Sequence, residues 1–332
     1  MNVMERPKVS VIIPVYGVER YIEQCARSLF EQTMQDGIEY IFVDDCSPDK
    51  SIEILENVLR EYPHREPQVK IIRHTENQGL GGTRKTGVKN ATGEYIIHCD
   101  SDDWVEPDMY EMLYGKASGE NADIVGCDYI FEYAKKSVVA RQPCPGNNIQ
   151  YISDLLSNKL YCGTWNKLIK RSVYCTVWKY GCEIFPMGIN MWEDVLTVNK
   201  LIYYCSRISY VPEALYHYRR TNEGSYTYNK PSLYDMREVI KRLSDFLNRN
   251  NINVSLDKLK ITVRHSYMES YPCVPKDIWS YMYPEIRDTH FLKRLYHQFL
   301  LFLATHHMIR ISGILIATTR KLCIGKHIRL AE

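Results

Sequence analysis

The chain has 332 residues, of which 45% are hydrophobic and 25% are charged, and its formal net charge is +2. This length accommodates one large domain or two small ones with a hydrophobic core, and the composition is typical of a soluble globular protein. Because the charge is nearly balanced, there is no overall basic character of the kind that binds nucleic acid, and we expect no nucleic-acid partner.

The cysteines and the hydrophobic segments bear on the compartment. The 11 cysteines form no CxxC pair, which indicates buried reduced thiols rather than disulfides or a zinc site. The first seven residues contain no hydrophobic segment of a signal peptide. No window offers about 18 uninterrupted apolar residues, so no transmembrane helix is expected. These features together predict a cytoplasmic protein.

Strand and helix patterns alternate through the first hundred residues. β-Branched or apolar runs predict strands at 9–13, 40–43, 69–72 and 94–99, and amphipathic patterns predict helices at 18–32, 52–59 and 79–90. Nearly continuous apolar strands separated by helices are typical of a parallel sheet that is covered on both faces. The N-terminal part is therefore predicted to be a doubly wound α/β domain.

The alternation weakens after Trp104. Further strands are predicted at 123–127, 129–131 and 208–211, the last as an edge strand that Pro212 closes. A loop is predicted at 143–148, a strand and turn at 161–171, and a helix at 192–204. Beyond about residue 225 the pattern is helical and rich in basic and aromatic residues.

Each of the first four predicted strands ends in polar residues, at 14–17, 44–47, 73–77 and 100–103. Right-handed crossovers place all four ends at one edge of the sheet, where ligands bind in open α/β sheets. We therefore expect the carboxylates of Asp44, Asp45, Asp100 and Asp102 to converge, whereas Asp49 or Ser51 caps the helix after the second strand.

The sequence Asp100-Ser101-Asp102-Asp103, directly after the apolar run 95–99, is the most informative local feature. Clustered carboxylates at a buried strand end are costly unless a cation collects there, and hard divalent cations prefer carboxylates together with phosphates. Taken alone, the cluster fits an acidic turn that caps the next helix equally well. Its position at the same sheet edge as the other polar strand ends favours a metal site.

Seven segments in this order resemble the family 2 (GT-A fold) inverting glycosyltransferases: Val11–Tyr16, Val43–Asp49, Asn77–Gly79, Asp100–Asp103, Trp165–Leu168, Trp192–Asp194 and Tyr216–Arg219. The resemblance covers about residues 8–225. It implies a GT-A-like α/β fold with a doubly wound, mostly parallel sheet, an acceptor-side subdomain and a C-terminal helical extension. The implied divisions are a nucleotide-sugar-binding half at 1–108, an acceptor-binding and catalytic half at 109–225, and a helical region at 226–332.

The donor side follows from the same resemblance. It implies a divalent ion, Mn²⁺ or Mg²⁺, on Asp102 and Asp100, which would act as a Lewis acid on the leaving diphosphate, while Asp103 is expected to cap the following turn. A carboxylate suits the N–H donor of uracil, so UDP-sugars are favoured. The residues expected at the nucleotide sugar are Pro14, Tyr16, Asp44, Asp45, Arg84, Asp100 and Ser101. For Arg84, an exposed helix cation is the alternative to a diphosphate contact, and its neighbours Thr83 and Lys85 depart from the Ala and Asn common in relatives.

The resemblance makes Asp194 the base that deprotonates the acceptor hydroxyl. The alternative is that Glu193 and Asp194 are acids at a helix N-terminus, which the helix dipole favours. Trp165, Asn166, Lys167 and Glu193 are implied on the acceptor side, although Trp165 could equally be a core residue.

The last of the seven segments leaves two assignments open. His217 is implied as a third metal ligand or as a packing residue, with packing favoured, since relatives often have another aromatic there. Arg219 either pairs with the diphosphate or forms a salt bridge within the protein.

The C-terminal stretch 296–330 mixes apolar and basic residues. Two interpretations are equally supported: a helical lid on the catalytic domain, or a peripheral contact with an anionic membrane at the inner face of the plasma membrane, where lipid-linked acceptors lie.

Together with these patterns, the resemblance implies a metal-dependent inverting glycosyltransferase of the hexosyltransferase type, which moves a sugar from UDP to a glycan or lipid-linked acceptor in bacterial cell-surface polysaccharide synthesis. A phosphohydrolase would place its nucleophilic aspartate after the first strand, where this chain has Pro14-Val15-Tyr16. The remaining alternative is a catalytically inactive relative that binds a nucleotide sugar or a glycan.

Overall fold

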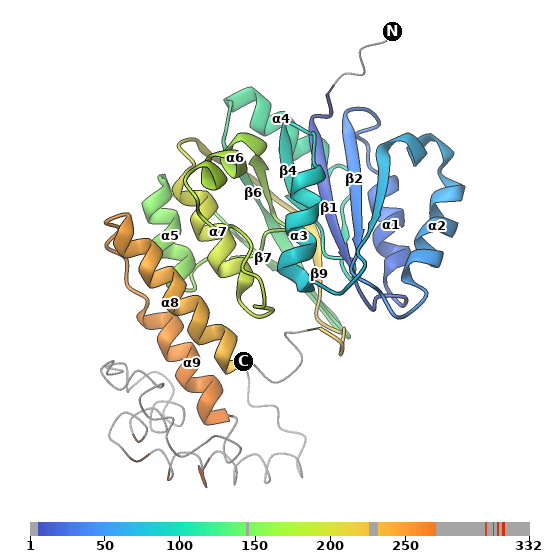
Figure 1. Cartoon of the computed structure of the whole chain (residues 1–332). Helices are drawn as coiled ribbons and strands as arrows, with labels where there is room; N and C mark the ends of the chain where they lie inside the picture. Colours follow the sequence, from blue (N-terminus) through green and yellow to red (C-terminus); the bar gives the residue numbers. More distant parts are fainter. Residues whose placement is uncertain are drawn as a thin grey trace.

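The computed structural model describes residues 6–143, 146–225 and 232–269, and five single positions nearer the C-terminus, 303, 308, 311, 314 and 315. In these parts of the chain the strands form one mixed sheet with helices on both faces (Figure 1). The predicted α/β class with a GT-A-like architecture is thereby confirmed.

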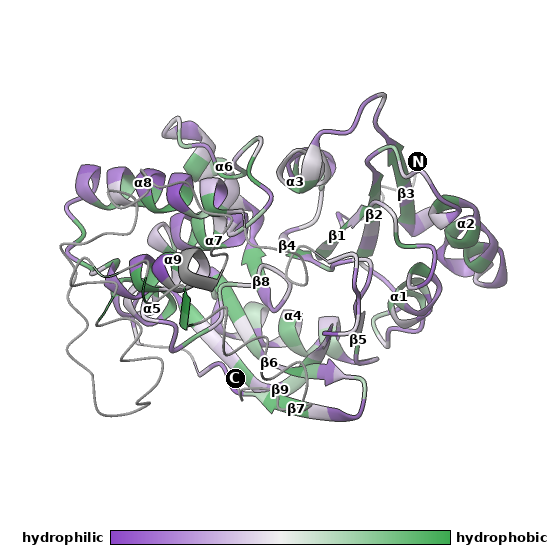
Figure 2. Ribbon diagram, turned by 90° about the horizontal axis from the view of Figure 1, so that it is seen from below, coloured by the Kyte–Doolittle hydropathy of each residue, from purple (hydrophilic) through white to green (hydrophobic). Residues whose placement is uncertain are grey.

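The N-terminal half is a parallel sheet in the order β3-β2-β1-β4. Its strands are β1 (Val9–Val15), β2 (Ile38–Asp44), β3 (Val69–Arg73) and β4 (Tyr95–His98), and its helices are α1 (Ile22–Phe30), α2 (Ser51–Glu61), the short 3-10 helix η1 (Pro63–Gln68) and α3 (Gly79–Asn90). Side chains alternate along β1, so that Ile12 joins the core under α3, whereas Val11 and Ile13 join the core under α1. Figure 2 shows α3 and α1 on opposite sides of these strands.

The sheet continues without interruption into the second half, because β4 pairs antiparallel with β8. The further strands are β5 (Trp104–Val105), β6 (Ile124–Tyr133), β7 (Lys136–Ala140), β8 (Lys167–Lys170) and β9 (Ile208–Arg219). The order from β4 onward is β4-β8-β6-β9-β5, and β7 pairs with β6. The helices are α4 (Met109–Glu120), α5 (Asn148–Leu156), α6 (Arg171–Lys179), α7 (Glu193–Tyr203), α8 (Leu233–Arg249) and α9 (Asp257–Glu269).

The prediction of an edge strand that ends before Pro212 is wrong. β9 continues to Arg219 and lies between β6 and β5, pairing with both. Pro212 is exposed and lies where the register with β6 shifts, because Cys127 pairs with Val211 and the next residue already pairs with Ala214. A proline has no amide to donate, and a bulge is where a paired strand tolerates that loss.

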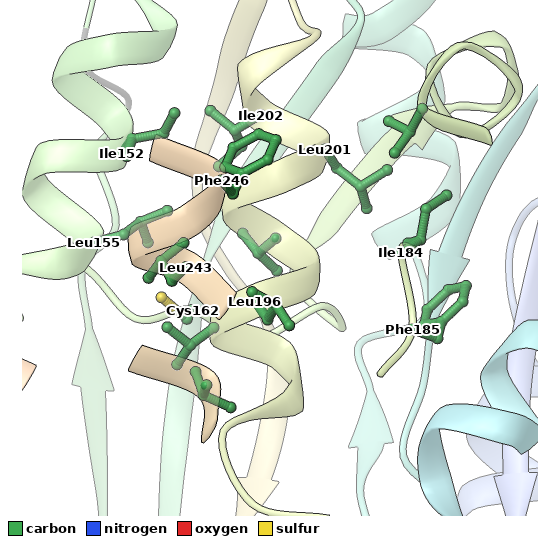
Figure 3. Close-up of a cluster of buried hydrophobic side chains, with 14 of the residues drawn as sticks. Ile152, Leu155, Cys162, Ile184, Phe185, Leu196, Leu201, Ile202, Leu243 and Phe246 are labelled. Carbon is green, nitrogen blue, oxygen red and sulfur yellow. The ribbon is translucent and has the colours of Figure 1, made fainter. Parts of the chain in front are cut away.

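The helices α5, α7 and α8 pack side by side through a shared hydrophobic core. Ile152 and Leu155 of α5, Leu196 and Ile202 of α7, and Leu243 and Phe246 of α8 meet there (Figure 3). No helix within the described parts of the chain is both long and apolar enough to span a bilayer. The stretch 296–330, for which we predicted a lid or a membrane contact, lies outside the described residues except for the five single positions.

Candidate active site

A cavity of about 870 Å³ opens where the strand order changes direction, at the carboxyl ends of β1 and β4. Successive strands run outward from β1 to β2 and β3, and the chain then crosses to the other side of β1 to form β4. Such a switch point is the general ligand site of open α/β sheets. The cavity lining includes Pro14 and Tyr16 after β1, Asp100 to Asp102 after β4, Arg84 of α3, and Glu193 and Asp194 of α7. Of these, Tyr16 is the most open, with 53% of its surface exposed.

The three aspartates after β4 occupy different environments. Asp100 and Asp102 line the cavity, whereas Asp103 is completely buried behind it. The Asp103 carboxylate accepts hydrogen bonds from the Tyr216 hydroxyl at 2.7 Å and from the Arg219 amide at 2.7 Å. Asp103 therefore anchors the acidic loop to β9, and our expectation that it caps the following turn is wrong.

Among the described residues, the Asp102 carboxylate has one side-chain hydrogen-bond partner, Asn222. Its Oδ2 accepts a hydrogen bond from the Asn222 amide at 2.7 Å. Burial, reinforced by the neighbouring Asp100 carboxylate, raises the pKa of Asp102 above its usual range. Within the described residues there is no cluster of three or more His, Cys, Asp or Glu side chains arranged to hold a metal ion. Two adjacent carboxylates on a cavity wall nevertheless fit an ion that takes its other ligands from phosphates and water, as Mg²⁺ commonly does.

Arg84 links the acidic loop after β4 to the N-terminus of α7. Its guanidinium is almost completely buried and donates to Glu193 Oε1 at 2.6 Å and to Asp100 Oδ1 at 2.9 Å. Although burial opposes the charged form, the nearby carboxylates, led by Asp100, raise the pKa of Arg84 further. Its third nitrogen position, Nε, is buried and has no hydrogen-bond partner among the described residues. Arg84 is thus not the exposed helix cation that the sequence left open as an alternative.

The N-terminus of α7 presents two carboxylates beside this arginine. Burial raises the pKa of Glu193 to about 7, and the adjacent Asp194 adds to this effect while Arg84 opposes it. Burial also raises the pKa of Asp194, against the lowering effect of Arg84. Asp194 Oδ1 accepts the amide of Val195 at 2.8 Å, which fixes the carboxylate at the start of the helix. A carboxylate with a raised pKa on a cavity wall has the properties of a general base.

The two aspartates at the end of β2, Asp44 and Asp45, accept hydrogen bonds from backbone amides of the protein. Asp45 is buried, and its carboxylate accepts the amides of Gln78 and Gly79 at 2.8 Å each, at the N-terminus of α3. His74 Nδ1 lies 2.7 Å from the same carboxylate. Asp45 also lines the cavity, but Asp44 is not part of the lining and accepts the Ser47 amide instead. The structure therefore brings only Asp45 to the cavity, where it positions α3.

The three residues 165–167, which we predicted on the acceptor side, are buried. Trp165 contributes to the cavity lining but is only 3% exposed, and it stacks on Tyr216 with ring centroids 4.3 Å apart. Asn166 donates to the carbonyl of Cys127 at 2.9 Å. Lys167 Nζ donates to the carbonyl oxygens of Tyr161 and Gly163 and to Asn166 Oδ1. Asn166 and Lys167 lie outside the lining and hold the loop that forms one cavity wall.

His217 does not reach the acidic cluster, so the structure contradicts its assignment as a third metal ligand. Its two ring nitrogens lie 2.8 Å from Glu132 Oε1 and 2.9 Å from Glu106 Oε1, and its ring stacks on Trp104. Neighbouring residues on a strand point to opposite faces, so His217 faces away from the Tyr216 side. These contacts fit the favoured alternative, in which His217 is a packing residue.

Arg219 supports the acidic loop through the protein itself. Its Nε donates to the carbonyl of Asp102 at 2.7 Å, and its guanidinium lies over the rings of Trp104 and Tyr21. Arg219 is not one of the described residues that line the cavity.

Our sequence analysis missed several residues that shape the site. Asn222 bonds Asp102 across 120 positions of sequence, and Tyr216 ties Asp103 to the amide of Asp100. Met236, Leu259, Thr262 and Ser266 of α8 and α9 complete the lining. Only Tyr216 lies in a segment that the family resemblance singled out, and nothing local marks the others.

The family model for glycosyl transferase family 2 matches residues 10–178, just over half of the chain. The chain belongs to glycosyl transferase family 2. The matched segment runs from within β1 to within α6 and includes Asp100 to Asp103, but it ends before Asp194. This family 2 chain is also 37% identical over 223 residues to the putative glycosyltransferase EpsH of Bacillus subtilis. That alignment covers 65% of this chain and 62% of EpsH, so the chain spans less than two thirds of that relative's length.

Solved structures share the fold at low sequence identity. TarS 1-349 of S. aureus, in complex with UDP-GlcNAc, has a TM-score of 0.59 and 19% identity, with 95% of this chain and 92% of the 1-349 chain covered. The mannosyltransferase PcManGT of Pyrobaculum calidifontis, in complex with GDP-Man and Mn²⁺, has a TM-score of 0.56 and 15% identity, with 97% and 81% covered. At these identities the likeness establishes the fold alone.

Proposed function

We propose that this protein is an inverting glycosyltransferase that moves a sugar from a UDP-sugar to a hydroxyl of a glycan or lipid-linked acceptor in bacterial cell-surface polysaccharide synthesis. The observation that carries the proposal is the single cavity at the sheet's switch point, which has Asp100 and Asp102 at one side and Glu193 and Asp194 at the other. Both sides are linked through Arg84. Membership in glycosyl transferase family 2 supports the reaction class.

The donor would bind at the ends of β1 and β4. Pro14 and the exposed Tyr16 are proposed beside the base and ribose, with Asp45 and the N-terminus of α3 close by. Ser101, which is buried but lines the cavity, is proposed at the sugar nucleotide. The buried and unpartnered Nε of Arg84 supports a contact with the diphosphate, because a phosphate oxygen would satisfy it. The neighbours in complex with UDP-GlcNAc and with GDP-Man both support a nucleotide-sugar donor.

Asp102 and Asp100 are the residues proposed to hold a divalent cation. When bound, Mn²⁺ or Mg²⁺ would neutralise the charge that develops on the leaving diphosphate. The raised pKa of Asp102 supports this assignment, since a nearby cation would relieve the repulsion between the two carboxylates. The Mn²⁺ complex of PcManGT is consistent with such a site in this fold.

Asp194 is the proposed base. It would take the proton of the acceptor hydroxyl as the hydroxyl oxygen forms a bond to the anomeric carbon and the bond to the diphosphate breaks on the opposite side. Glu193 is bonded to Arg84 and is therefore less suited to this task. The inverting outcome is proposed from the family resemblance alone.

A screen for release of the nucleoside diphosphate, UDP or GDP, tests the proposal. Purified protein is incubated with UDP-glucose, UDP-galactose, UDP-N-acetylglucosamine and GDP-mannose in Mn²⁺, Mg²⁺ or EDTA, with glycoside acceptors. We expect UDP to be released from at least one UDP-sugar. This release should require the metal and should be lost in Asp194→Asn. Release from GDP-mannose alone would contradict the donor assignment, and absence of turnover and of nucleotide-sugar binding under all conditions would contradict the function.

A further inference from the structure

The backbone of Trp192 is unusual for so large a residue. Its φ is +64°, in the left-handed region, and it immediately precedes the first residue of α7, Glu193. A bulky side chain rarely adopts this conformation, and such strain is retained mainly where the position of the side chain matters. The half-buried Trp192 lines the same cavity as Asp194, two positions further along the chain.

The other tryptophans near the site are already engaged by neighbouring groups. Trp165 stacks on Tyr216, and Tyr129 meets it edge-on at 4.8 Å. Trp104 lies between the His217 ring and the Arg219 guanidinium. By contrast, no aromatic ring or cation from the described residues stacks on the indole of Trp192. Trp192 packs in part against the hydrophobic core that α5, α7 and α8 share, and the part of its half-buried side chain that lines the cavity is available to a ligand.

The wall beside Trp192 comes from the C-terminal helices. Met236 of α8 and Leu259 of α9 contribute apolar surface to the cavity lining, and Thr262 of α9 contributes a hydroxyl-bearing side chain. Asp235 of α8 accepts the amides of Asn190 and Met191 at 3.0 and 3.1 Å, so α8 is bonded to the loop that leads into Trp192. These bonds hold the backbone of the loop that leads into Trp192 against α8.

We propose that Trp192 is the platform for the ring of a neutral acceptor saccharide, and that α8 and α9 form the rest of this acceptor subsite. This inference rests on the proposed transferase function and adds the acceptor class to it. A pyranose ring has an apolar C–H face, which suits an indole, and a rim of hydroxyls, which suits polar groups at the edge of the site. The carboxylate of Asp194, two positions after Trp192, disfavours an anionic acceptor by charge repulsion.

Binding of simple glycosides to Trp192 variants tests the subsite. The probes are methyl β-glucoside, methyl β-galactoside, methyl N-acetyl-β-glucosaminide and decyl β-glucoside, added to the full chain with UDP and Mn²⁺, and binding is measured by ligand-observed NMR. We expect Trp192→Ala to weaken methyl glycoside binding about tenfold, the factor that corresponds to about 1.4 kcal/mol. Trp192→Phe keeps an aromatic ring and should lose about threefold.

Trp178→Ala is the matched control, because Trp178 is also half-buried and packs against the same hydrophobic core but does not line the cavity. It should bind glycosides as the wild type does, and all variants should bind UDP equally by calorimetry. If the Ala variant fails to fold, the comparison between Trp192→Phe and wild type decides.

Three results would overturn the assignment. The first is equal glycoside affinity in wild type and both Trp192 variants. The second is a wild type that binds UDP but none of the methyl glycosides. The third is binding of decyl β-glucoside alone, with no effect of Trp192, which would make the alkyl chain the recognised group. A wild type that binds no UDP would instead contradict the proposed function itself.

Discussion

Arg84 is a buried cation among the five carboxylates of the cavity lining, Asp45, Asp100, Asp102, Glu193 and Asp194. It bonds directly to Asp100 and Glu193, and the charges of these two and of Asp194 raise its pKa. Asp102 is left with an amide partner and a raised pKa. The cavity thus holds more negative than positive charge, which favours binding of a cation together with its diphosphate ligand.

Replacing the proposed base should abolish turnover without affecting donor binding. Asp194→Asn keeps the shape of the side chain but cannot accept the hydroxyl proton, so we expect kcat to fall by a factor of about 10² to 10⁴. The donor KM should stay close to the wild-type value, as measured in initial-rate assays. Because burial raises the pKa of Asp194, wild-type activity should fall on the acid side at a higher pH than for an ordinary aspartate. An unchanged kcat would exclude Asp194 as the base.

Glu193 should make stability depend on pH in a defined direction. Its pKa is about 7 in the folded protein, compared with 4.5 as its ordinary value. The group therefore favours folding below pH 4.5, and this contribution is lost as the pH rises through 7. Relative to wild type, Glu193→Gln should gain up to about 3 kcal/mol of unfolding free energy between pH 4.5 and 8. Urea unfolding of both proteins across this range measures the difference, and parallel pH curves would contradict it.

The buried bond between Tyr216 and Asp103 is expected to contribute to stability. Tyr216→Phe removes the hydroxyl that donates to Asp103 and accepts the Asp100 amide, leaving two buried groups without that partner. We expect a loss of about 1–3 kcal/mol in unfolding free energy. Tyr234→Phe, at an exposed position of α8, is the control. Because Tyr234 is 72% exposed, this change should leave the unfolding free energy almost unchanged. Equal stability of the two variants would argue against the anchoring role of Asp103.

At the scale of elements, the close approach of α3 to β1 brings Arg84 to the cavity. A Cβ built on Gly87 would lie 2.2 Å from Ile12 Cγ2, and one on Gly81 would lie 2.7 Å from the carbonyl oxygen of Pro186. Any larger residue at these positions would push α3 outward. The two glycines therefore set the distance at which α3 packs, and so the position of Arg84.

Alanine at Gly87 should destabilise the protein, although alanine is the better helix former. We expect overpacking against β1 to cost about 1–3 kcal/mol, as for other additions to a filled core. Gly115→Ala in α4 is the matched control, since nothing lies within 4 Å of its Cβ position, and it should gain about 0.5–1 kcal/mol from helix propensity. Thermal unfolding compares the two, and a stabilised Gly87→Ala variant would show that α3 can move freely.

Local patterns predicted the elements of the N-terminal half well, because β1, β2 and β4 are apolar runs, α1 and α2 are amphipathic, and glycine opens α3. The predicted helix at 79–90 has the bounds of α3, and β1 to β4 overlap the predicted strands. The same approach failed at β9, where Pro212 was taken as a strand end. A bulge depends on the partner strand, and the local sequence does not contain that information.

At the scale of the whole molecule, the sheet edge gathers side chains that are far apart in the chain. Convergence of Asp100 and Asp102 with Arg84 was predictable from strand topology and family resemblance. The burial of Trp165 was one of two open alternatives, whereas that of Lys167 was not predicted, because it depends on bonds to the carbonyl oxygens of the loop before β8. The contributions of Asn222 and of α8 and α9 were also unpredictable, since each depends on tertiary contacts between distant parts of the chain.

In the proposed mechanism, Asp102 and Asp194 have different tasks within one cavity. Asp102 binds the donor through a metal ion, and Asp194 takes the proton of the acceptor hydroxyl. Calorimetric titration of UDP into wild type, Asp102→Asn and Asp194→Asn, each with Mn²⁺ and with EDTA, tests this division of tasks most directly. We predict metal-dependent binding in wild type and in Asp194→Asn, and a loss of at least about tenfold in affinity in Asp102→Asn. Metal-dependent binding of equal strength in all three proteins, or binding that EDTA does not weaken, would contradict the account.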